Sequence, residues 1–344
     1  MNSALDHKCP NCDAVLKFNP KEQNWKCEYC RSEFNLEQLN TYEEKTKEET
    51  KTGEIDLYSC PNCGAEIIAD ENITTTSCVY CKNTAILKNR FQGEFNPDYL
   101  IPFKNTKEDA IEAFKKLTKG KILMPKEFKS LKNIKEMSGI YIPFWLYDYD
   151  ANGIVEADCK RITSWRSGNY RYTKTDTFLA LRGGNMSFSN VPVDGSKKFS
   201  NEIMNSIEPF DYSELKNFNV SYLSGFLSEK YDVDKAVAIA DGNIRAKNSF
   251  IEQMRKDITG YNTVIPIKDS INLNNTNSKY VLLPVWLLNI KYKDKIYPFA
   301  MNGQTGKLIG DIPIDNKKAF LIWLGLVLIV FIITFIIFYL QVKL

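Results

Sequence analysis

The longest apolar stretch lies close to the carboxyl terminus. Residues 319–340 contain no charged side chain, and Trp323 and Tyr339 lie toward its two ends. At ~1.5 Å per residue a helix of this length covers roughly 33 Å, enough for a hydrocarbon core of ~30 Å. Aromatic residues at both ends are typical of membrane-water interfaces. The pattern therefore predicts a transmembrane helix over residues 319–340.

Helical spacing recurs at three places before this stretch. Residues 107–119 predict a helix, which Thr106 can cap and Gly120 can end. Its apolar stripe consists of Ala110, Phe114 and Leu117. A second helix is expected to begin near Asp211, where the sequence resembles a capping box. Residues 232–258 predict a third helix, with Gly242 as a break.

Strand patterns outnumber the helical ones. Residues rich in aromatic and β-branched side chains predict strands over 139–149, 154–165, 170–181, 262–267, 280–292 and 297–301. Hairpin turns are expected at 152–153, 167–169 and 302–303, because Asn and Gly tolerate positive φ. Strands and helices in clusters predict an α+β domain over residues 95–314 with a mostly antiparallel sheet.

A polar segment, residues 36–56, separates two short blocks at the amino terminus. Its centre alternates Glu and Lys, which predicts a solvated, partly helical linker. Leu36 and Leu39 are expected to pack on the first block. We expect this charged linker to hold the amino-terminal blocks farther from the membrane than the sheet domain.

Eight of the nine cysteines form two blocks with identical internal spacing. Each block reads CxxC-x14-CxxC, and the cysteines are Cys9, Cys12, Cys27, Cys30, Cys60, Cys63, Cys78 and Cys81. Two cysteines three residues apart on a tight knuckle aim both sulfurs at one point, and a second knuckle completes a tetrahedron. We predict two zinc ribbons, residues 1–35 and 57–90, with all eight cysteines as ligands and two Zn(2+) per chain. Disulfides, or iron in place of zinc, are the alternatives.

The residues after the first knuckles also fit this interpretation. Gly64 follows the first knuckle of the second block, and Asp13 takes that place in the first block, where Asp tolerates a left-handed conformation. Four thiolates close the coordination shell, so both sites are expected to be structural rather than catalytic.

Composition narrows the chemistry further. The chain has 45 basic and 42 acidic residues, and both ribbons balance in charge, which favours protein over nucleic acid as the partner of the ribbons. His7 is the one histidine, and we interpret it as a surface residue. The sequence has neither a GxxxxGK[ST] nor a GxGxxG motif, so a P-loop ATPase is excluded. Cys159 has no neighbouring base and is expected to be an inert, buried thiol.

Pairs of carboxylates in the 95–314 domain are the candidates for a catalytic site. Asp148 and Asp150 would share one face of a strand, as would Glu156 and Asp158. Such a pair can run acid–base chemistry, so a hydrolase stays an alternative. The spacing is equally typical of a solvated strand, and we expect the protein not to be an enzyme.

The charges next to the apolar stretch predict its orientation. Lys317 and Lys318 precede the stretch and Lys343 follows it, and the eight cysteines suit a reducing compartment. The first residues are polar, so no signal peptide is expected. We predict a tail-anchored, single-pass protein of the bacterial cell membrane with its amino-terminal domains in the cytoplasm.

The chain resembles a family of bacterial membrane-anchored twin-zinc-ribbon proteins, labelled TFIIB-type zinc-ribbon proteins and sometimes replication-restart helicases. The segments that carry the resemblance are both CPNC knuckles, 101–104 with the helix after it, 139–146, 191–196, 209–212, 222–226, 283–286 and 302–306. They follow one another over most of the chain. Asp13 departs from the usual glycine after a knuckle and leaves all four ligands in place.

The resemblance implies an accessory membrane component. Members are often encoded beside flotillin-like (SPFH) or phage-shock-type proteins, which implies recruitment of such partners at the membrane in envelope stress. A helicase is not expected, because the ATP-binding loop is missing. The leading hypothesis is a scaffold or adaptor that recruits protein partners; a membrane-tethered nucleic-acid-binding protein is the second.

Overall fold

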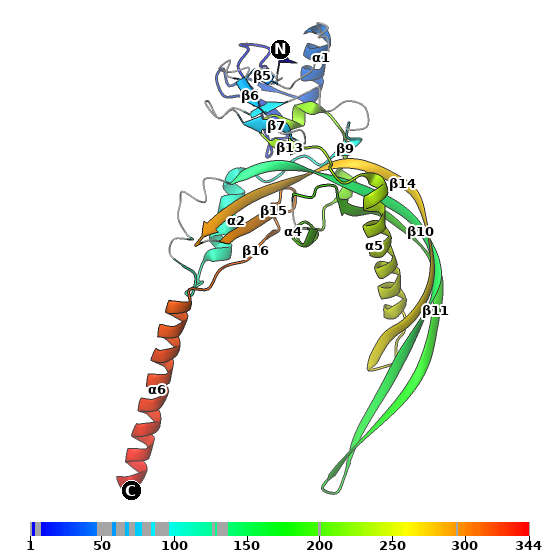
Figure 1. The fold of residues 1–344 in the computed structure, drawn as a ribbon, viewed down its shortest axis with the longest axis vertical. Helices are drawn as coiled ribbons and strands as arrows, with labels where there is room; N and C mark the ends of the chain where they lie inside the picture. Colours follow the sequence, from blue (N-terminus) through cyan, green and yellow to red (C-terminus); the bar gives the residue numbers. More distant parts are fainter. Residues whose placement is uncertain are drawn as a thin grey trace.

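The fold is an α+β body with an amino-terminal ribbon packed on it and two long projections, a curved arm of strands and a carboxyl-terminal helix (Figure 1). The computed structural model describes residues 2–3, 8–46, 57–59, 66–68, 73–77, 84–86, 96–125, 128, 137–198, 201–293 and 295–343. Within these residues most strand pairs are antiparallel, as predicted; the parallel pairs are β1 with β5, β9 with β14, and β10 with β13.

The first ribbon is a small antiparallel sheet followed by a helix. Its strands are β2 (Leu16–Asn19), β3 (Asn24–Cys27) and β4 (Glu33–Phe34), and α1 (Leu36–Thr46) follows. The predicted partial helix in the linker is therefore confirmed. Leu39 is buried in the core that ribbon and body share, and Leu36 packs against it.

The central sheet of the body has the order β12-β9-β14-β10-β13-β7-β8, and β11 pairs with β10 while β15 pairs with β14 and β16. The long strands are β10 (Ser138–Ser167), β11 (Tyr170–Asp194) and β14 (Thr263–Tyr292). The shorter strands of the described residues are β1 (Asn2–Ser3), β5 (Leu57–Ser59), β6 (Glu66–Ile68), β7 (Ile73–Ser77), β8 (Thr84–Ile86), β9 (Tyr99–Leu100), β12 (Lys216–Asn217), β13 (Leu227–Glu229), β15 (Lys295–Asn302) and β16 (Leu308–Gly310).

The near-continuous apolar start of β10 fits its central position, because both of its faces are buried. Tyr141 and Tyr147 face the core that includes ribbon 1, whereas Ile142, Phe144 and Leu146 face a second core. That second core is closed by α4 (Asn201–Ser206) and the residues after it.

The helix predicted over 107–119 is confirmed as α2 (Lys107–Thr118). Thr106 caps it and forms a reciprocal capping box with Asp109, and Gly120 takes a φ of 75° beyond its end. The helix predicted near Asp211 is wrong. Asp211 caps only the single 3₁₀ turn η4 (Tyr212–Glu214), and a second turn, η5 (Val220–Leu223), follows.

The third predicted helix is α5 (Lys235–Lys256), which packs along the concave side of β10, β11 and β14 (Figure 1). Gly242 does not break it, contrary to the prediction. A Cβ on Gly242 would lie 2.5 Å from Tyr149 Oη and 3.0 Å from Tyr147 Cδ2. The glycine therefore permits close packing of α5 on the sheet.

The strands predicted over 139–149 and 154–165 are one continuous strand, β10, and those predicted over 262–267 and 280–292 are one continuous strand, β14. Asn152–Gly153 was expected to turn, but β10 runs through it, pairing with β11 on one side and β14 on the other. A Cβ on Gly153 would lie 2.5 Å from the Ser270 carbonyl oxygen, so the glycine allows the backbones to approach. The turn at 167–169 is confirmed, with a φ of 60° at Gly168. The chain also turns after Asn302, as predicted at 302–303, but the residue with positive φ is Gly306, at 78°, rather than Asn302 or Gly303.

The last helix, α6 (Asn316–Lys343), contains the predicted apolar stretch. Residues Asn316–Phe338 are long and apolar enough to cross a membrane, and none of that stretch is buried in the protein. Asp315 N donates to Leu123 O at 2.8 Å, and Lys318 Nζ donates to Met124 O at 2.9 Å, so the start of α6 contacts the body.

Candidate metal centre

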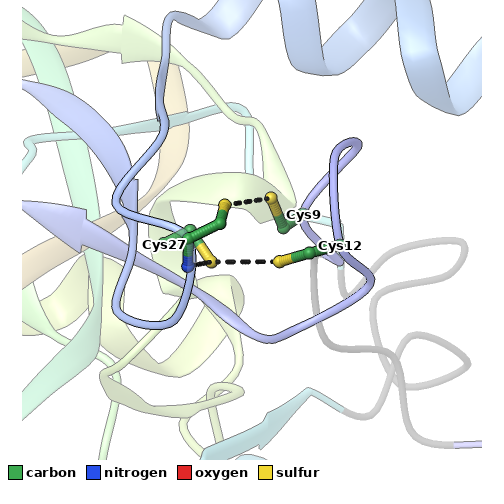
Figure 2. Close-up of side chains that lie close together, drawn as sticks. Cys9, Cys12 and Cys27 are labelled. Atoms are coloured by element: carbon green, nitrogen blue, oxygen red, sulfur yellow. Dashed lines mark hydrogen bonds between the residues drawn. The ribbon is translucent and has the colours of Figure 1, made fainter.

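Two backbone knuckles bring the four cysteines of the first block together. Cys9 and Cys12 flank the first knuckle, and Cys27 and Cys30 flank the second, at the end of β3 (Figure 2). The four Sγ atoms all lie within 4.8 Å of one another. The sequence spacing therefore identified a real cluster in the described part of the chain.

The sulfur-to-sulfur distances suit one tetrahedral ion. Cys9 Sγ lies 3.5 Å from Cys30 Sγ, and Cys12 Sγ lies 3.5 Å from Cys27 Sγ. A tetrahedron with metal–sulfur bonds of ~2.3 Å has edges of about 3.8 Å. The cluster could therefore hold a metal ion with little rearrangement.

Backbone hydrogen bonds shape both knuckles in the same way. Asp13 N donates to Cys9 O at 2.9 Å, and Arg31 N donates to Cys27 O at 3.0 Å. Both residues adopt positive φ, 56° at Asp13 and 62° at Arg31. The expectation that Asp13 replaces the usual glycine is confirmed. Cys30 N also points at Cys27 Sγ, 3.5 Å away.

Ser32 and Asn11 support the ligands from outside the cluster, and sequence reasoning missed both. Ser32 Oγ lies 3.2 Å from Cys30 Sγ and accepts a hydrogen bond from Asn11 Nδ2 at 2.9 Å. Asn11 belongs to the first knuckle and Ser32 follows the second, so this contact joins the two knuckles. Such groups orient metal ligands and tune their basicity.

The protonation of the thiols favours a bound cation. Burial raises the pKa of the Cys9 thiol to about 12, while the Ser32 hydroxyl and backbone lower the pKa of Cys30 to about 6. The Cys9 thiol therefore keeps its proton near neutral pH unless a positive charge lies beside it. A divalent ion supplies that charge and displaces the protons. An ion bound by all four thiolates would have no open ligand position, which is the arrangement of structural rather than catalytic sites.

Ribbon 1 packs directly on the body through β2 and β3. Trp25, which is 1% exposed, donates from Nε1 to Ser221 O at 2.8 Å. Its ring centroid lies 5.1 Å from that of Phe18 and 5.1 Å from that of Tyr222. Phe18 N donates to Ser224 O at 3.2 Å. The ribbon is thus part of the body's core rather than a module held off it by the linker.

Two further contacts join the turn between β2 and β3 to the body. Gln23 Nε2 donates to Phe103 O at 2.8 Å, and Lys21 Nζ lies 2.6 Å from an oxygen of Asp109 at the start of α2. Where the ribbon meets the body, a cavity of about 870 Å³ lies between β2, the start of α2 and the start of β10. These contacts could not be predicted from sequence patterns, because each joins residues far apart in the chain.

The second cysteine block lies outside the described residues. Cys60, Cys63, Cys78 and Cys81 are all in this category, as are Gly64 and His7. The neighbouring strand β7 (Ile73–Ser77) is described, and it pairs with β13 of the body through Ser228 and Glu229.

Cys159 and Asp148, two further candidates from the sequence, are each held by contacts within the fold. Cys159 is fully buried against Ala157, Ala180 and Ile258, as expected of an inert thiol. Asp148 lies 3.1 Å from Lys279 Nζ and accepts from Asn190 N at 2.7 Å. Burial alone would raise the pKa of Asp148, but these contacts outweigh it and lower the pKa.

Asp150 and Glu156, from the two predicted carboxylate pairs, also have polar partners. Asp150 accepts from Ser187 Oγ at 2.7 Å, and Glu156 lies 4.0 Å from Lys268 Nζ. A carboxylate with a raised pKa occurs elsewhere, at Asp194, where burial raises the pKa to about 7. Asp194 Oδ1 accepts from Ser196 N at 3.0 Å, and Asp194 does not line the cavity beside ribbon 1.

Comparison with known proteins gives one clear relative. No family model and no solved structure matches the chain. The chain is 35% identical over 314 residues to the uncharacterized protein YdjG of Bacillus subtilis (strain 168), and the alignment covers 91% of this chain and 92% of that protein. Because this identity extends over nearly all of both sequences, the chain belongs to the same family as YdjG.

Proposed function

We propose that the protein is a membrane-anchored adaptor whose metal ribbons recruit protein partners to the bacterial cell membrane. The observation that carries the proposal is the fixed position of ribbon 1. Its Trp25 is buried in the body of a chain that ends in a helix able to cross a membrane, and its second knuckle is exposed. A partner bound to that knuckle would be held at a fixed position relative to the membrane, on the side of the body away from α6 (Figure 1) and without a flexible linker.

The exposed side of ribbon 1 favours a protein partner. Trp25 is not available to stack on a base, since it is buried. The residues around the second knuckle carry both signs of charge, with Lys26, Glu28, Arg31 and Glu33 all exposed or partly exposed. Phosphate binding would need a surplus of Lys and Arg. Tyr29, which is 82% exposed, is a side chain of the type that anchors protein interfaces.

The metal would be zinc, with two ions per chain, one in each ribbon. Four thiolates at tetrahedral spacing are the ligand set of structural zinc sites, and the second block repeats the same spacing in sequence. The metal-binding free energy, about 10–16 kcal/mol in small zinc peptides, would stabilise a ribbon with little apolar core of its own.

The amino-terminal part would face the cytoplasm, where thiolates stay reduced. Partners of flotillin-like (SPFH) or phage-shock type, acting in envelope stress, follow from the family resemblance described above. A non-enzymatic role is favoured because Asp148, Asp150 and Glu156 already have partners within the fold.

A co-purification experiment tests the adaptor. The full chain is extracted from native membranes in mild detergent, and proteins bound to wild type, Tyr29→Ala and Val237→Ala are quantified by mass spectrometry. Val237 is a matched control, since it is 64% exposed and belongs to α5 rather than to the ribbon. We expect Tyr29→Ala to lose at least one protein that wild type and Val237→Ala retain. Cys60→Ser with Cys63→Ser tests the second ribbon in the same assay. Recovery of the same proteins with every variant would contradict recruitment by the ribbons.

A further inference from the structure

The tip of the arm, residues 160–174, is a two-stranded hairpin, which we call the distal hairpin; its base contacts residues 260–262 through Arg161 and Ile162. It begins where β14 begins, since Thr263 pairs with Lys160, and it lies beyond the end of α5 at Lys256. Ser167 pairs with Tyr170 around the turn at Gly168. Residues 160–175 are exposed on both faces. A two-stranded hairpin with no covering element is marginally stable in water, so the side chains at this tip call for an explanation.

The distal hairpin carries one sign of charge. It contains five basic residues, namely Lys160, Arg161, Arg166, Arg171 and Lys174, and no acidic residue. Arg166 pairs directly with Arg171 across the two strands. Like charges directly opposite each other are destabilising. No ion pair joins either arginine to an acidic side chain within the described residues, and Lys174 is paired with Asp176 just outside the segment.

Exposed aromatic side chains alternate with these charges. Trp165 is 49%, Tyr170 72% and Tyr172 46% exposed, and the Trp165 and Tyr172 rings stack with centroids 5.7 Å apart. Trp and Tyr together with Arg and Lys are the residues enriched where a protein meets the headgroup layer of a membrane. Anionic headgroups would also relieve the repulsion between Arg166 and Arg171.

The chain itself brings a membrane close to this tip. Figure 1 shows that the arm and α6 project from the same side of the body. From Tyr147 to Ser167 the arm could span up to roughly 65 Å at ~3.3 Å per residue. The arm therefore has the direction and the length to reach the bilayer that α6 enters.

We propose that the distal hairpin binds the anionic headgroups of the same membrane that α6 spans, as a second, peripheral contact. The inference rests on the membrane anchoring of the proposed function. In Figure 1 the tip reaches about as far as the end of α6. Five cations are too costly to place in hydrocarbon, so the contact requires the tip to lie in the headgroup layer at the near surface, with the arm at a different angle to α6 than in Figure 1. The body would then rest on the membrane at two places.

Photo-crosslinking of the full chain in vesicles tests this. Tyr170 is replaced by p-benzoylphenylalanine, and the purified chain is reconstituted in phosphatidylcholine alone or in phosphatidylcholine with phosphatidylglycerol. We expect several-fold more lipid adducts in the phosphatidylglycerol vesicles. High salt should lower the yield, because exposed charges are screened. Arg166→Glu with Arg171→Glu should reduce the yield to that of phosphatidylcholine alone, and both positions are exposed, so the change should not affect folding. The same probe at Tyr29 is the matched control.

The outcomes separate the two proposals. Release of the chain from vesicles at alkaline pH would refute the anchoring by α6, and this inference with it. Stable insertion with no more adducts at Tyr170 than at Tyr29 would refute the distal hairpin alone. Adducts of Tyr170 to a second copy of the chain, or their loss on adding an RNA oligonucleotide at moderate salt, would also overturn the lipid contact.

Discussion

The contact between ribbon 1 and the body gives the sharpest prediction. Trp25→Ala removes a side chain that is 1% exposed, together with its hydrogen bond to Ser221 O. The rings of Phe18 and Tyr222, whose centroids are 5.3 Å apart, would each lose a ring partner. The cysteines are untouched, so the metal site itself should survive while the ribbon detaches from the body.

The size of the effect follows from these contacts. Truncation of a buried Trp to Ala typically costs 3–5 kcal/mol. A loss of that size raises the population of the detached state between about a hundredfold and a few thousandfold, since 1.4 kcal/mol is a factor of ten. Trp25→Phe retains a ring and loses the indole hydrogen bond, so it should cost only about 1 kcal/mol, roughly fivefold.

Amide hydrogen exchange of the detergent-solubilised chain measures this opening. Exchange should accelerate in β2, in η5 and around Phe103, where the ribbon contacts the body, and should stay unchanged in the distal part of β14. Tyr29→Ala is the matched control on the same ribbon, because Tyr29 is 82% exposed and its loss should change nothing. Equal exchange in wild type and Trp25→Ala would show that the ribbon is not docked as described.

Three further outcomes follow from the fold. Gly242→Leu should destabilise the body by at least about 1–3 kcal/mol in urea unfolding, because a Cβ there would lie 2.5 Å from Tyr149 Oη, whereas Asp241→Ala on the exposed side of α5 should be neutral. The pKa of Asp194 is raised by burial to about 7 from 3.8, so this carboxyl binds its proton more tightly in the folded state, and its contribution to stability is lost as pH rises from about 4 to 7. Asp194→Asn should therefore raise the thermal midpoint at pH 8 and leave it nearly unchanged near pH 4; an equal shift at both values would contradict the assignment. Protease added to inverted membrane vesicles should digest the amino-terminal part, and protease added to intact spheroplasts should spare it; the reverse pattern would place the ribbons outside the cytoplasm.

Features set by neighbours in the chain were predictable from the sequence. Thr106 and Asp109 sit three residues apart and form the cap of α2. The CxxC spacing placed Cys9, Cys12, Cys27 and Cys30 at one point, and the uncharged stretch within α6 needed only its length and composition. In each case the deciding contacts are local, so spacing carries the information.

Features set by distant segments were not predictable. Asn152–Gly153 is a strong turn sequence, but strands on both sides of β10 hold it extended, and the glycine instead makes room for the Ser270 carbonyl. The sequence around Gly242 predicts a helix break, whereas the fold packs Tyr147 and Tyr149 against this glycine within a continuous helix. Trp25 looks like the local core of a ribbon, and only the fold brings Tyr222 to it. The sequence shows that the distal hairpin contains basic and no acidic residues, but only the fold shows that these residues are exposed.

The thiolate centre is the central claim, and metal analysis of the freshly purified full chain tests it most directly. We predict about two zinc ions per chain in wild type and one fewer in Cys9→Ser with Cys12→Ser, measured by elemental analysis alongside thiol titration. Chains that contain neither zinc nor iron, or whose cysteines are paired in disulfides when isolated under reducing conditions, would contradict it.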